Sequence, residues 1–122
     1  MEKHILLIDD DPDELEIFID ALRAKGLELK CSAVYSAKEA FEFLNLMVPD
    51  YIVLDYQMPK INGLECLVDI KAAKQLAHIP VIMYSSTMEE DDIETAMILG
   101  AKGCIKKPFD MRTLASLLKP FL

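Results

Sequence analysis

Acidic side chains follow two short apolar segments of this sequence, where together they could bind a cation. Asp9, Asp10 and Asp11 come directly after the first segment, and Asp55 ends the second. Carboxylates that converge repel one another and raise each other's pKa unless a cation lies among them. Hard oxygen ligands in a small cluster favour Mg²⁺, which keeps several waters and takes one or two protein carboxylates. Asp11 also fits a simpler role as a helix cap before Pro12, but that role does not explain Asp9 and Asp10.

Hydroxyl and ammonium groups follow two later apolar segments. They are carried by Ser85, Ser86, Lys106 and Lys107. Together with Mg²⁺, a lysine and a small hydroxyl could stabilise the equatorial oxygens of a phosphoryl group during in-line transfer. The Asp55 carboxylate would then be the nucleophile and would form an acyl phosphate. A solvated surface lysine is the competing interpretation of Lys107, and its position before Pro108 and Phe109 at a strand end favours the site.

The elements that must position these groups alternate between short apolar runs and longer stretches with helical spacing. The predicted strands are His4–Ile8, Leu29–Val34, Tyr51–Leu54, Val81–Tyr84 and Gly103–Ile105. The first, third and fourth are nearly all apolar, as expected of central strands in a parallel sheet that is covered on both faces.

Helix starts are indicated where a capping residue is followed three residues later by Glu. The pairs are Asp11 with Glu14, Ser36 with Glu39, and Thr87 with Glu90. A further helix should follow Gly63 with three apolar residues on one face, namely Leu64, Leu67 and Ile70. Helix ends are expected at Gly26 and Gly100. The last helix should start at Asp110 and bury Met111, Leu114, Leu117, Leu118 and Phe121.

Five strands that alternate with five helices predict an α/β fold, a flavodoxin-like (βα)5 doubly wound open parallel sheet with strand order 2-1-3-4-5. In such sheets ligands bind beyond the C-terminal ends of strands 1 and 3, where the strand order reverses. The acids Asp9, Asp10 and Asp55 are therefore expected at the binding site.

Composition limits the classes of function that the chain could have. Its 122 residues are 52% hydrophobic and carry a net charge of −8. One globular domain is expected, and the negative charge argues against direct binding of nucleic acid. No apolar run approaches the roughly 20 residues of a membrane helix, so we expect no membrane segment and a cytoplasmic location. Cys31, Cys66 and Cys104 are widely spaced, which favours reduced thiols over disulfides or a zinc site.

Four segments, in this order and spacing, carry a resemblance to a known family. They read ILLIDDDPDEL, IVLDYQMPKINGLE, VIMYSS and GAKGCIKKPF. Together they resemble the receiver domain of bacterial response regulators in two-component signalling, including stand-alone chemotaxis-type receivers. The resemblance covers essentially the whole chain, so residues 1–122 are expected to form one receiver domain, with no output domain in this chain.

The resemblance implies a Mg²⁺-dependent phosphoacceptor site. Asp9 and Asp10 would form the acidic pair around Mg²⁺, and Asp55 would accept the phosphoryl group. The backbone carbonyl of Gln57 would complete the metal site together with these carboxylates. The family pattern also places Gln57 and Thr87 beside the path of the water that hydrolyses the phosphorylated form.

The resemblance further implies how the phosphoryl group is sensed and by which partners. Ser85 would provide the switch hydroxyl, and Lys107 would contact the phosphoryl group, with a cis peptide bond between Lys107 and Pro108. The donor would be a sensor histidine kinase or a histidine phosphotransfer protein. A downstream protein would bind through the fourth helix, the fifth strand and the last helix. Cys104 departs from the pattern, because many receivers carry Tyr or Phe there, and a cysteine cannot act as that aromatic switch.

Other interpretations of the same residues stay open. A receiver-shaped binding module that is never phosphorylated would have the same fold. A hydrolase with an aspartyl-phosphate intermediate also uses an Asp at a strand end, but it usually needs a second acid where this chain has Gln57. A flavin-binding electron carrier is less favoured, because acidic residues at Asp9–Asp11 would repel the flavin phosphate.

Overall fold

The computed structural model describes residues 3–24, 26, 29–57, 62–107 and 114–122. The strands are β1 (Lys3–Ile8), β2 (Leu29–Val34), β3 (Tyr51–Asp55), β4 (Val81–Ser85) and β5 (Gly103–Lys106). The helices are α1 (Glu14–Ala24), α2 (Ala37–Leu46), α3 (Gly63–Ala72), α4 (Glu90–Ile98), α5 (Leu114–Leu118) and the 3-10 helix η2 (Lys119–Phe121). Within the described ranges, no helix is both long and apolar enough to cross a membrane.

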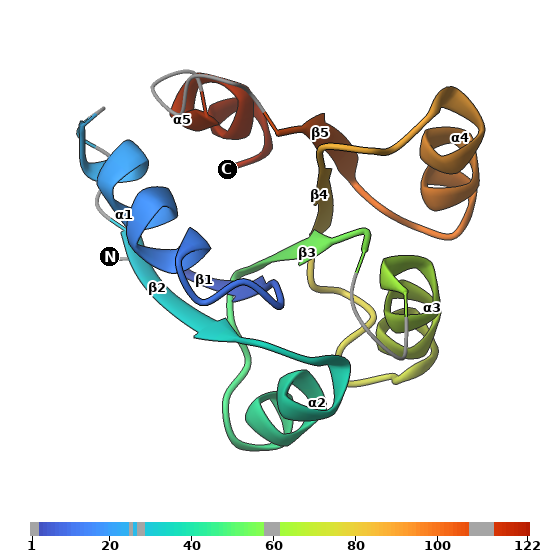
Figure 1. The fold of residues 1–122 in the computed structure, drawn as a ribbon. Coiled ribbons are helices and arrows are strands. Elements are labelled where there is room, and N and C mark those ends of the chain that lie inside the picture. The colour runs from blue at the N-terminus through green and yellow to red at the C-terminus, as the bar shows by residue number, and fades with distance from the viewer. Residues whose placement is uncertain (1–2, 25, 27–28, 58–61, 108–113) are drawn as a thin grey trace.

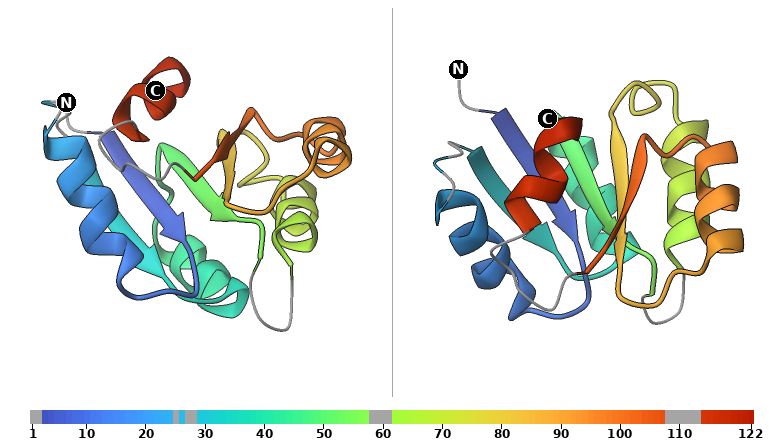
Figure 2. Two further views of the ribbon diagram at one scale, coloured as in Figure 1. Left: turned by 45° about the horizontal axis from the view of Figure 1, so that its top comes forward. Right: turned by 90° about the horizontal axis from the view of Figure 1, so that it is seen from above.

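The strands form one parallel sheet in the order β2-β1-β3-β4-β5. Helices α1 and α5 cover one face of this sheet, and α2, α3 and α4 cover the other (Figure 1). All strands run in one direction, so their carboxyl ends lie along the same edge (Figure 2). The predicted flavodoxin-like fold and strand order are confirmed.

The central strands send alternate side chains into two apolar cores, because successive residues of a strand point to opposite faces of the sheet. Leu6 and Ile8 of β1 pack with α2, α3 and α4, whereas Ile5 and Leu7 pack with α1 and α5. Every residue of β3 and β4 is buried, Asp55 and Ser85 included. The apolar runs therefore carry two polar side chains into positions that solvent barely reaches.

The predicted helix starts are confirmed at α2 and wrong at α4. Ser36 caps α2, where its hydroxyl accepts a hydrogen bond from the amide of Glu39 at 3.1 Å. The cap of α4 is Glu89 rather than Thr87, and Asp92 completes its capping box. Thr87 lies two residues before this cap, and its amide donates a hydrogen bond to the hydroxyl of Ser85 at 3.1 Å.

The remaining helix boundaries follow local backbone geometry. Asp11 accepts a hydrogen bond from the amide of Asp13 ahead of α1, and Asn62 caps α3 through the amide of Glu65. Gly26 and Gly100, where α1 and α4 were expected to end, have φ angles of +71° and +108°. Non-glycine residues rarely adopt such angles, which accounts for glycine after both helices.

The C-terminal helix agrees only in part with its prediction. Asp110 and Met111 lie outside the described residues, and only the backbone of Leu114 is described. Leu118 is fully buried in the core beneath α1, but the expected burial of Leu117 is wrong, since this side chain is 42% exposed. A one-residue step rotates a helical side chain by about 100°, so Leu117 faces away when Leu118 faces the core.

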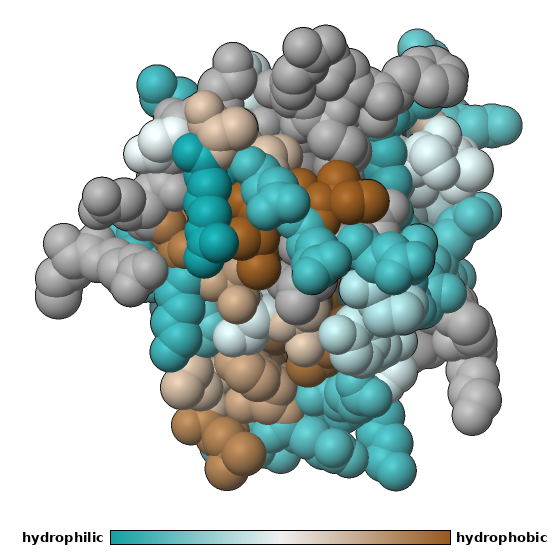
Figure 3. All heavy atoms as spheres, turned by 60° about the vertical axis from the view of Figure 1, so that its left-hand side comes forward, coloured by the Kyte–Doolittle hydropathy of each residue, from teal (hydrophilic) through white to brown (hydrophobic). Residues whose placement is uncertain are grey.

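Hydrophilic side chains dominate much of the face that Figure 3 turns forward, and apolar side chains gather there in separate patches. Among the described residues, the most exposed large apolar side chains are Leu46 and Ile98, which are the last residues of α2 and α4. Isolated apolar side chains on a surface are usual. The groups with chemical potential lie elsewhere, along the edge where the parallel strands end.

A substitution of Gly63 would test how closely α3 packs against the end of β3. A Cβ atom at this position would overlap the backbone oxygen of Asp55 and lie 2.8 Å from the Cα of Tyr56. We expect Gly63→Ala to lower the free energy of unfolding by about 2–3 kcal/mol in urea titrations, since backbone atoms cannot move aside cheaply. Gly26→Ala is the matched control, because no described atom lies within 4 Å of its Cβ and its positive φ gives a cost of about 1 kcal/mol. Equal unfolding midpoints for the two variants would contradict this packing.

Candidate functional site

Three carboxylates meet at the edge of the sheet where β1 and β3 end. Asp9 and Asp10 follow β1, and Asp55 is the last residue of the neighbouring strand β3. Each offers an oxygen atom that lies within 4.8 Å of the oxygens of the other two. Asp9 and Asp55 are 2% and 5% exposed, whereas Asp10 is open to solvent. The structure therefore brings the predicted acids together.

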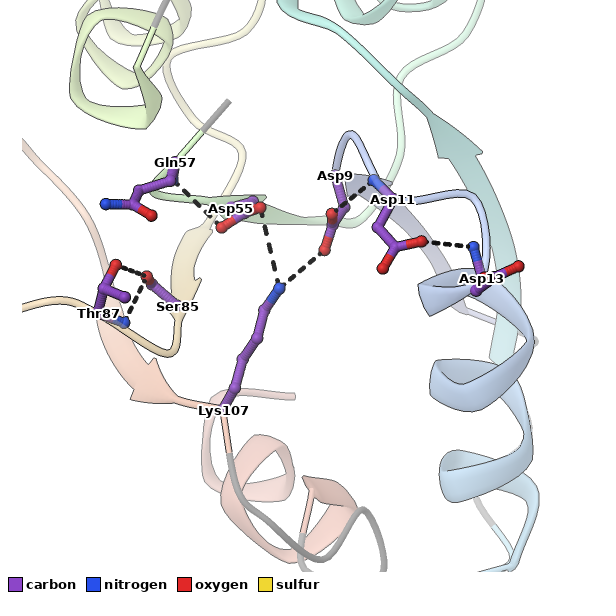
Figure 4. A network of polar contacts seen from close by, with 8 residues as sticks. All are labelled: Asp9, Asp11, Asp13, Asp55, Gln57, Ser85, Thr87 and Lys107. Carbon is purple, nitrogen blue, oxygen red and sulfur yellow. Dashed lines mark hydrogen bonds and ion pairs between the residues drawn. The ribbon is translucent and has the colours of Figure 1, made fainter. Parts of the chain in front are cut away.

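Lys107, directly after β5, places its ammonium group between two of these carboxylates (Figure 4). Its Nζ atom lies 3.1 Å from Oδ2 of Asp9 and 3.9 Å from Oδ2 of Asp55. Lys106, the alternative lysine at this strand end, has an exposed side chain. The alternation of side chains along an extended chain explains the difference, since successive residues point to opposite sides of the sheet.

Asp9 and Asp55 are held in the same manner. In each, the Oδ1 atom accepts a hydrogen bond from the backbone amide two residues later, Asp11 for Asp9 at 3.0 Å and Gln57 for Asp55 at 3.2 Å. The Oδ2 atoms of both carboxylates are the ones that approach Lys107. One oxygen of each carboxylate is thus held by the nearby backbone, and the other faces Lys107.

The pKa of Asp55 is raised from its usual value of 3.8 to about 7. Burial is the main cause, because it disfavours the charged form, and the carboxylates of Asp9 and Asp10 add to it. The Lys107 ammonium and the hydrogen bond from the Gln57 amide lower the pKa, but they do not offset burial. Asp55 is thus a carboxylate whose charge is poorly stabilised by the protein alone.

Ser85 lies at the end of β4 with its side chain buried, at 2% exposure, whereas Ser86 is exposed. Its hydroxyl points toward Thr87 (Figure 4), lying 3.1 Å from the Thr87 amide and 3.3 Å from its hydroxyl. The Ser85 carbonyl accepts a hydrogen bond from the backbone amide of Lys107 at 2.9 Å. The structure therefore joins Ser85 to the lysine through the backbone, while its hydroxyl is held on the loop before α4.

The donor set suits Mg²⁺ better than a transition metal. Asp9, Asp10 and Asp55 supply hard carboxylate oxygens, and the exposure of Asp10 leaves room for the bound waters that Mg²⁺ retains. Among the described residues, three carboxylates face one ammonium group here, so a divalent cation would remove the excess negative charge. The backbone carbonyl of Gln57 stays a predicted ligand. The predicted cis bond to Pro108 lies outside the described residues.

Two contacts beside the site were not anticipated from the sequence. The hydroxyl of Tyr56 donates to Oδ1 of Asp92 at 2.8 Å, and Oδ2 of Asp92 accepts from the Glu89 amide at the start of α4. The hydrogen bond to Asp92 raises the pKa of Tyr56. The hydrogen bonds from the Glu89 amide and from the Tyr56 hydroxyl lower the pKa of Asp92. The second contact places the Lys107 ammonium over the ring of Tyr84, 4.9 Å from its centroid.

The cysteines agree with the sequence prediction. Cys66 is buried, Cys31 and Cys104 are partly buried, and none of them forms a disulfide. Burial raises the pKa of the Cys66 thiol to about 12 and also raises the pKa of Cys104. Cys104 packs against the core that contains α4, where many receivers would place an aromatic ring.

Residues 5–119 match the family described as response regulator receiver domain. The chain is 32% identical over 120 residues to the transcriptional regulatory protein CpxR homolog of Haemophilus influenzae, covering 97% of this chain and 49% of that protein. It is 34% identical over 121 residues to the transcriptional regulatory protein CrdR of Helicobacter pylori, covering 99% of this chain and 55% of that protein. The chain thus spans about half the length of these curated relatives.

Solved structures agree with this assignment. The phosphorylated cyanobacterial phytochrome response regulator RcpA superposes with a TM-score of 0.86 at 29% identity, covering 99% of this chain and 91% of that one. The chain therefore belongs to the response regulator receiver domain family. Receivers are signalling modules that partner with histidine kinases or histidine phosphotransfer proteins, and they bind Mg²⁺ at an acidic pocket. Membership favours a phosphoacceptor over the hydrolase, the flavin carrier and the module that is never phosphorylated.

The raised pKa of Asp55 predicts a pH-dependent effect on stability. A carboxyl whose folded-state pKa exceeds its unfolded value contributes stability that is present below pH 4 and is lost as the pH rises through about 7. Asp55→Asn should therefore raise the free energy of unfolding of metal-free protein, with a gain that grows from pH 4 and reaches about 1–3 kcal/mol at pH 8. Urea titrations in a chelating buffer measure this gain.

Asp20→Asn serves as the control, since Asp20 is an exposed carboxylate on α1 outside the acidic pocket. Its effect on stability should be small, because substitutions of exposed side chains usually change stability little. A gain for Asp55→Asn that does not change between pH 4 and pH 8 would contradict the burial of its charge.

Proposed function

We propose that this protein is a phosphoacceptor receiver that takes a phosphoryl group on Asp55 in a Mg²⁺-dependent reaction and changes its partner binding as a result. The observation that carries the proposal is the buried Asp55 carboxylate at the end of β3, with two acids within 4.8 Å and Lys107 at 3.9 Å. A phosphohistidine of a sensor kinase or a phosphotransfer protein would be the donor. Family membership and the motif residues support this assignment.

In the reaction, an oxygen of Asp55 forms a bond to phosphorus while the bond from phosphorus to the donor nitrogen breaks, which leaves an acyl phosphate. Asp9, Asp10 and Asp55, with the Gln57 carbonyl, would hold Mg²⁺, whose charge neutralises phosphoryl oxygens. Lys107 contacts another phosphoryl oxygen from its place between the strand ends. The amide bonds to Asp9 and Asp55 keep the carboxylates oriented, so little reorganisation is needed when the donor arrives.

Ser85 would report the modification to the rest of the molecule. In the resting arrangement its hydroxyl is hydrogen-bonded to the amide and the hydroxyl of Thr87. Donation of this hydroxyl to a phosphoryl oxygen would release Thr87, two residues before the cap of α4. A negatively charged group on Asp55 thereby biases the loop that leads into α4.

We place the output surface on α4, β5 and α5, where a downstream protein would bind, and we take residues 1–122 as one receiver unit acting in the cytoplasm. The net charge of −8 supports a protein partner over nucleic acid for this chain. Cys104 on β5 provides a small side chain rather than a mobile ring. The contact between Tyr56 and Asp92 offers a second route from the phosphoacceptor to α4, since Tyr56 directly follows Asp55.

Asp55→Asn should abolish phosphorylation. Wild-type protein incubated with acetyl phosphate and Mg²⁺ is expected to gain the mass of one phosphoryl group, and the gain should disappear when Mg²⁺ is chelated. Asp69→Asn is the matched control, because Asp69 is an exposed carboxylate of α3. Intact-mass spectrometry measures each outcome. Labelling of Asp55→Asn at the wild-type rate would overturn the choice of phosphoacceptor.

Tyr56→Phe tests the route to α4, because it removes only the hydroxyl that bonds to Asp92. We expect amide hydrogen exchange across residues 89–93 to rise about 3- to 10-fold in the resting protein. We also expect a smaller further change when beryllofluoride and Mg²⁺ are added, while labelling at Asp55 persists. Tyr35→Phe, at an exposed tyrosine after β2, is the control. Identical exchange in wild type and Tyr56→Phe, with and without beryllofluoride, would rule out this route.

A further inference from the structure

The ring of Tyr84 lies directly beneath the ammonium group of Lys107. Nζ of Lys107 is 4.9 Å from the ring centroid, within the range at which a cation is attracted to an aromatic face. Tyr84 is fully buried on β4, and Phe18 of α1 meets its ring edge-on at 6.3 Å. The ring therefore has little freedom to move away from the lysine.

Strand β4 holds Lys107 at two points. The backbone amide of Lys107 donates to the Ser85 carbonyl at 2.9 Å. The ammonium group of Lys107 lies over the ring of Tyr84, the residue before Ser85. In the sheet, Tyr84 is the direct partner of Asp55 on β3 and of Ile105 on β5. The ladder thus fixes the ring relative to the phosphoacceptor on one side and to the lysine-bearing strand on the other.

The attraction of the ring differs in kind from the ion pairs of Lys107. The pair with Asp9, at 3.1 Å, weakens when the Asp9 charge is shared with a bound cation, because both compete for the same carboxylate. The π face of Tyr84 carries no net charge and binds no metal, so a bound cation does not compete with the ammonium for it. A buried ring also avoids the screening that weakens exposed cation–π pairs.

We infer that Tyr84 is a positioning residue that holds the Lys107 ammonium toward the phosphoryl group on Asp55. The inference rests on the proposed phosphoacceptor function and deepens it, since it adds an aromatic residue to the carboxylates, the hydroxyl and the lysine. The competing explanation is that Tyr84 only fills the core against Phe18 and that its contact with Lys107 has no effect on phosphorylation.

Fluorinated phenylalanines at position 84 separate these explanations. Tyr84→Phe keeps the ring face, and one, two or three fluorine atoms then withdraw electron density from it with little change in size. If the ring positions Lys107, the logarithm of the labelling rate with acetyl phosphate and Mg²⁺ should fall stepwise with each fluorine, by about 3- to 30-fold in total. If the ring only fills space, the rate should stay level while thermal unfolding confirms that the variants are folded.

Two further measurements make the result specific to Lys107. In a Lys107→Met background the fluorine series should be flat, because no cation remains above the ring. In metal-free wild type, the ε-methylene protons of Lys107 should show an upfield ring-current shift by NMR, which Tyr84→Leu should abolish. The NMR measurement needs neither Mg²⁺ nor phosphoryl transfer.

The outcomes distinguish this inference from the proposed function. If the wild-type protein gains no phosphoryl group, the proposed function is wrong, and so is the role of Tyr84 that rests on it. Wild type that is labelled, with a flat fluorine series or with no ring-current shift on Lys107, would overturn the inference alone. A graded decline that vanishes in Lys107→Met would support it.

Discussion

Electrostatic repulsion among three neighbouring carboxylates is the constraint on which this structure depends. Asp9, Asp10 and Asp55 share a space of a few ångströms, and among the described residues Lys107 supplies the ammonium group there. Burial is the main cause of the raised pKa of Asp55, and the two neighbouring carboxylates raise it further. The carboxylates stay together because adjacent parallel strands, buried on both faces, end at this point. Apolar packing beneath the site opposes the repulsion above it, so the pocket is poised to accept a cation and a phosphoryl group.

Backbone and uncharged groups help to order the surroundings of the site, beside the ion pairs of Lys107. Backbone amides orient Asp9 and Asp55, and an aromatic ring lies under Lys107. Ser85 and Tyr56 then link this region to the start of α4 through two separate hydrogen bonds. In the proposed mechanism Cys104 on β5 has no ring that could follow a movement of Ser85, so the link through Tyr56 gains importance.

Sequence reasoning was most successful where the signal is local. Apolar runs followed by acids, a hydroxyl or a lysine indicated the strands and five of the side chains at their ends, while family resemblance supplied the individual roles. The predicted start of α4 was wrong, since Glu89 caps the helix and Thr87 lies two residues earlier, in a loop where its amide bonds to the Ser85 hydroxyl. The contacts of Tyr56 with Asp92 and Tyr84 with Lys107 depend on strand order and helix rotation, which no local pattern reveals.

The distance along the chain between the partners of the site has a consequence for biosynthesis. Asp9 and Lys107 are 98 positions apart, and they meet only after β5 has added to the edge of the sheet. A nascent chain on the ribosome exposes its acids well before the lysine of the same site is synthesised. The proposed phosphoacceptor site therefore cannot be complete until β5 has been synthesised and has paired with β4.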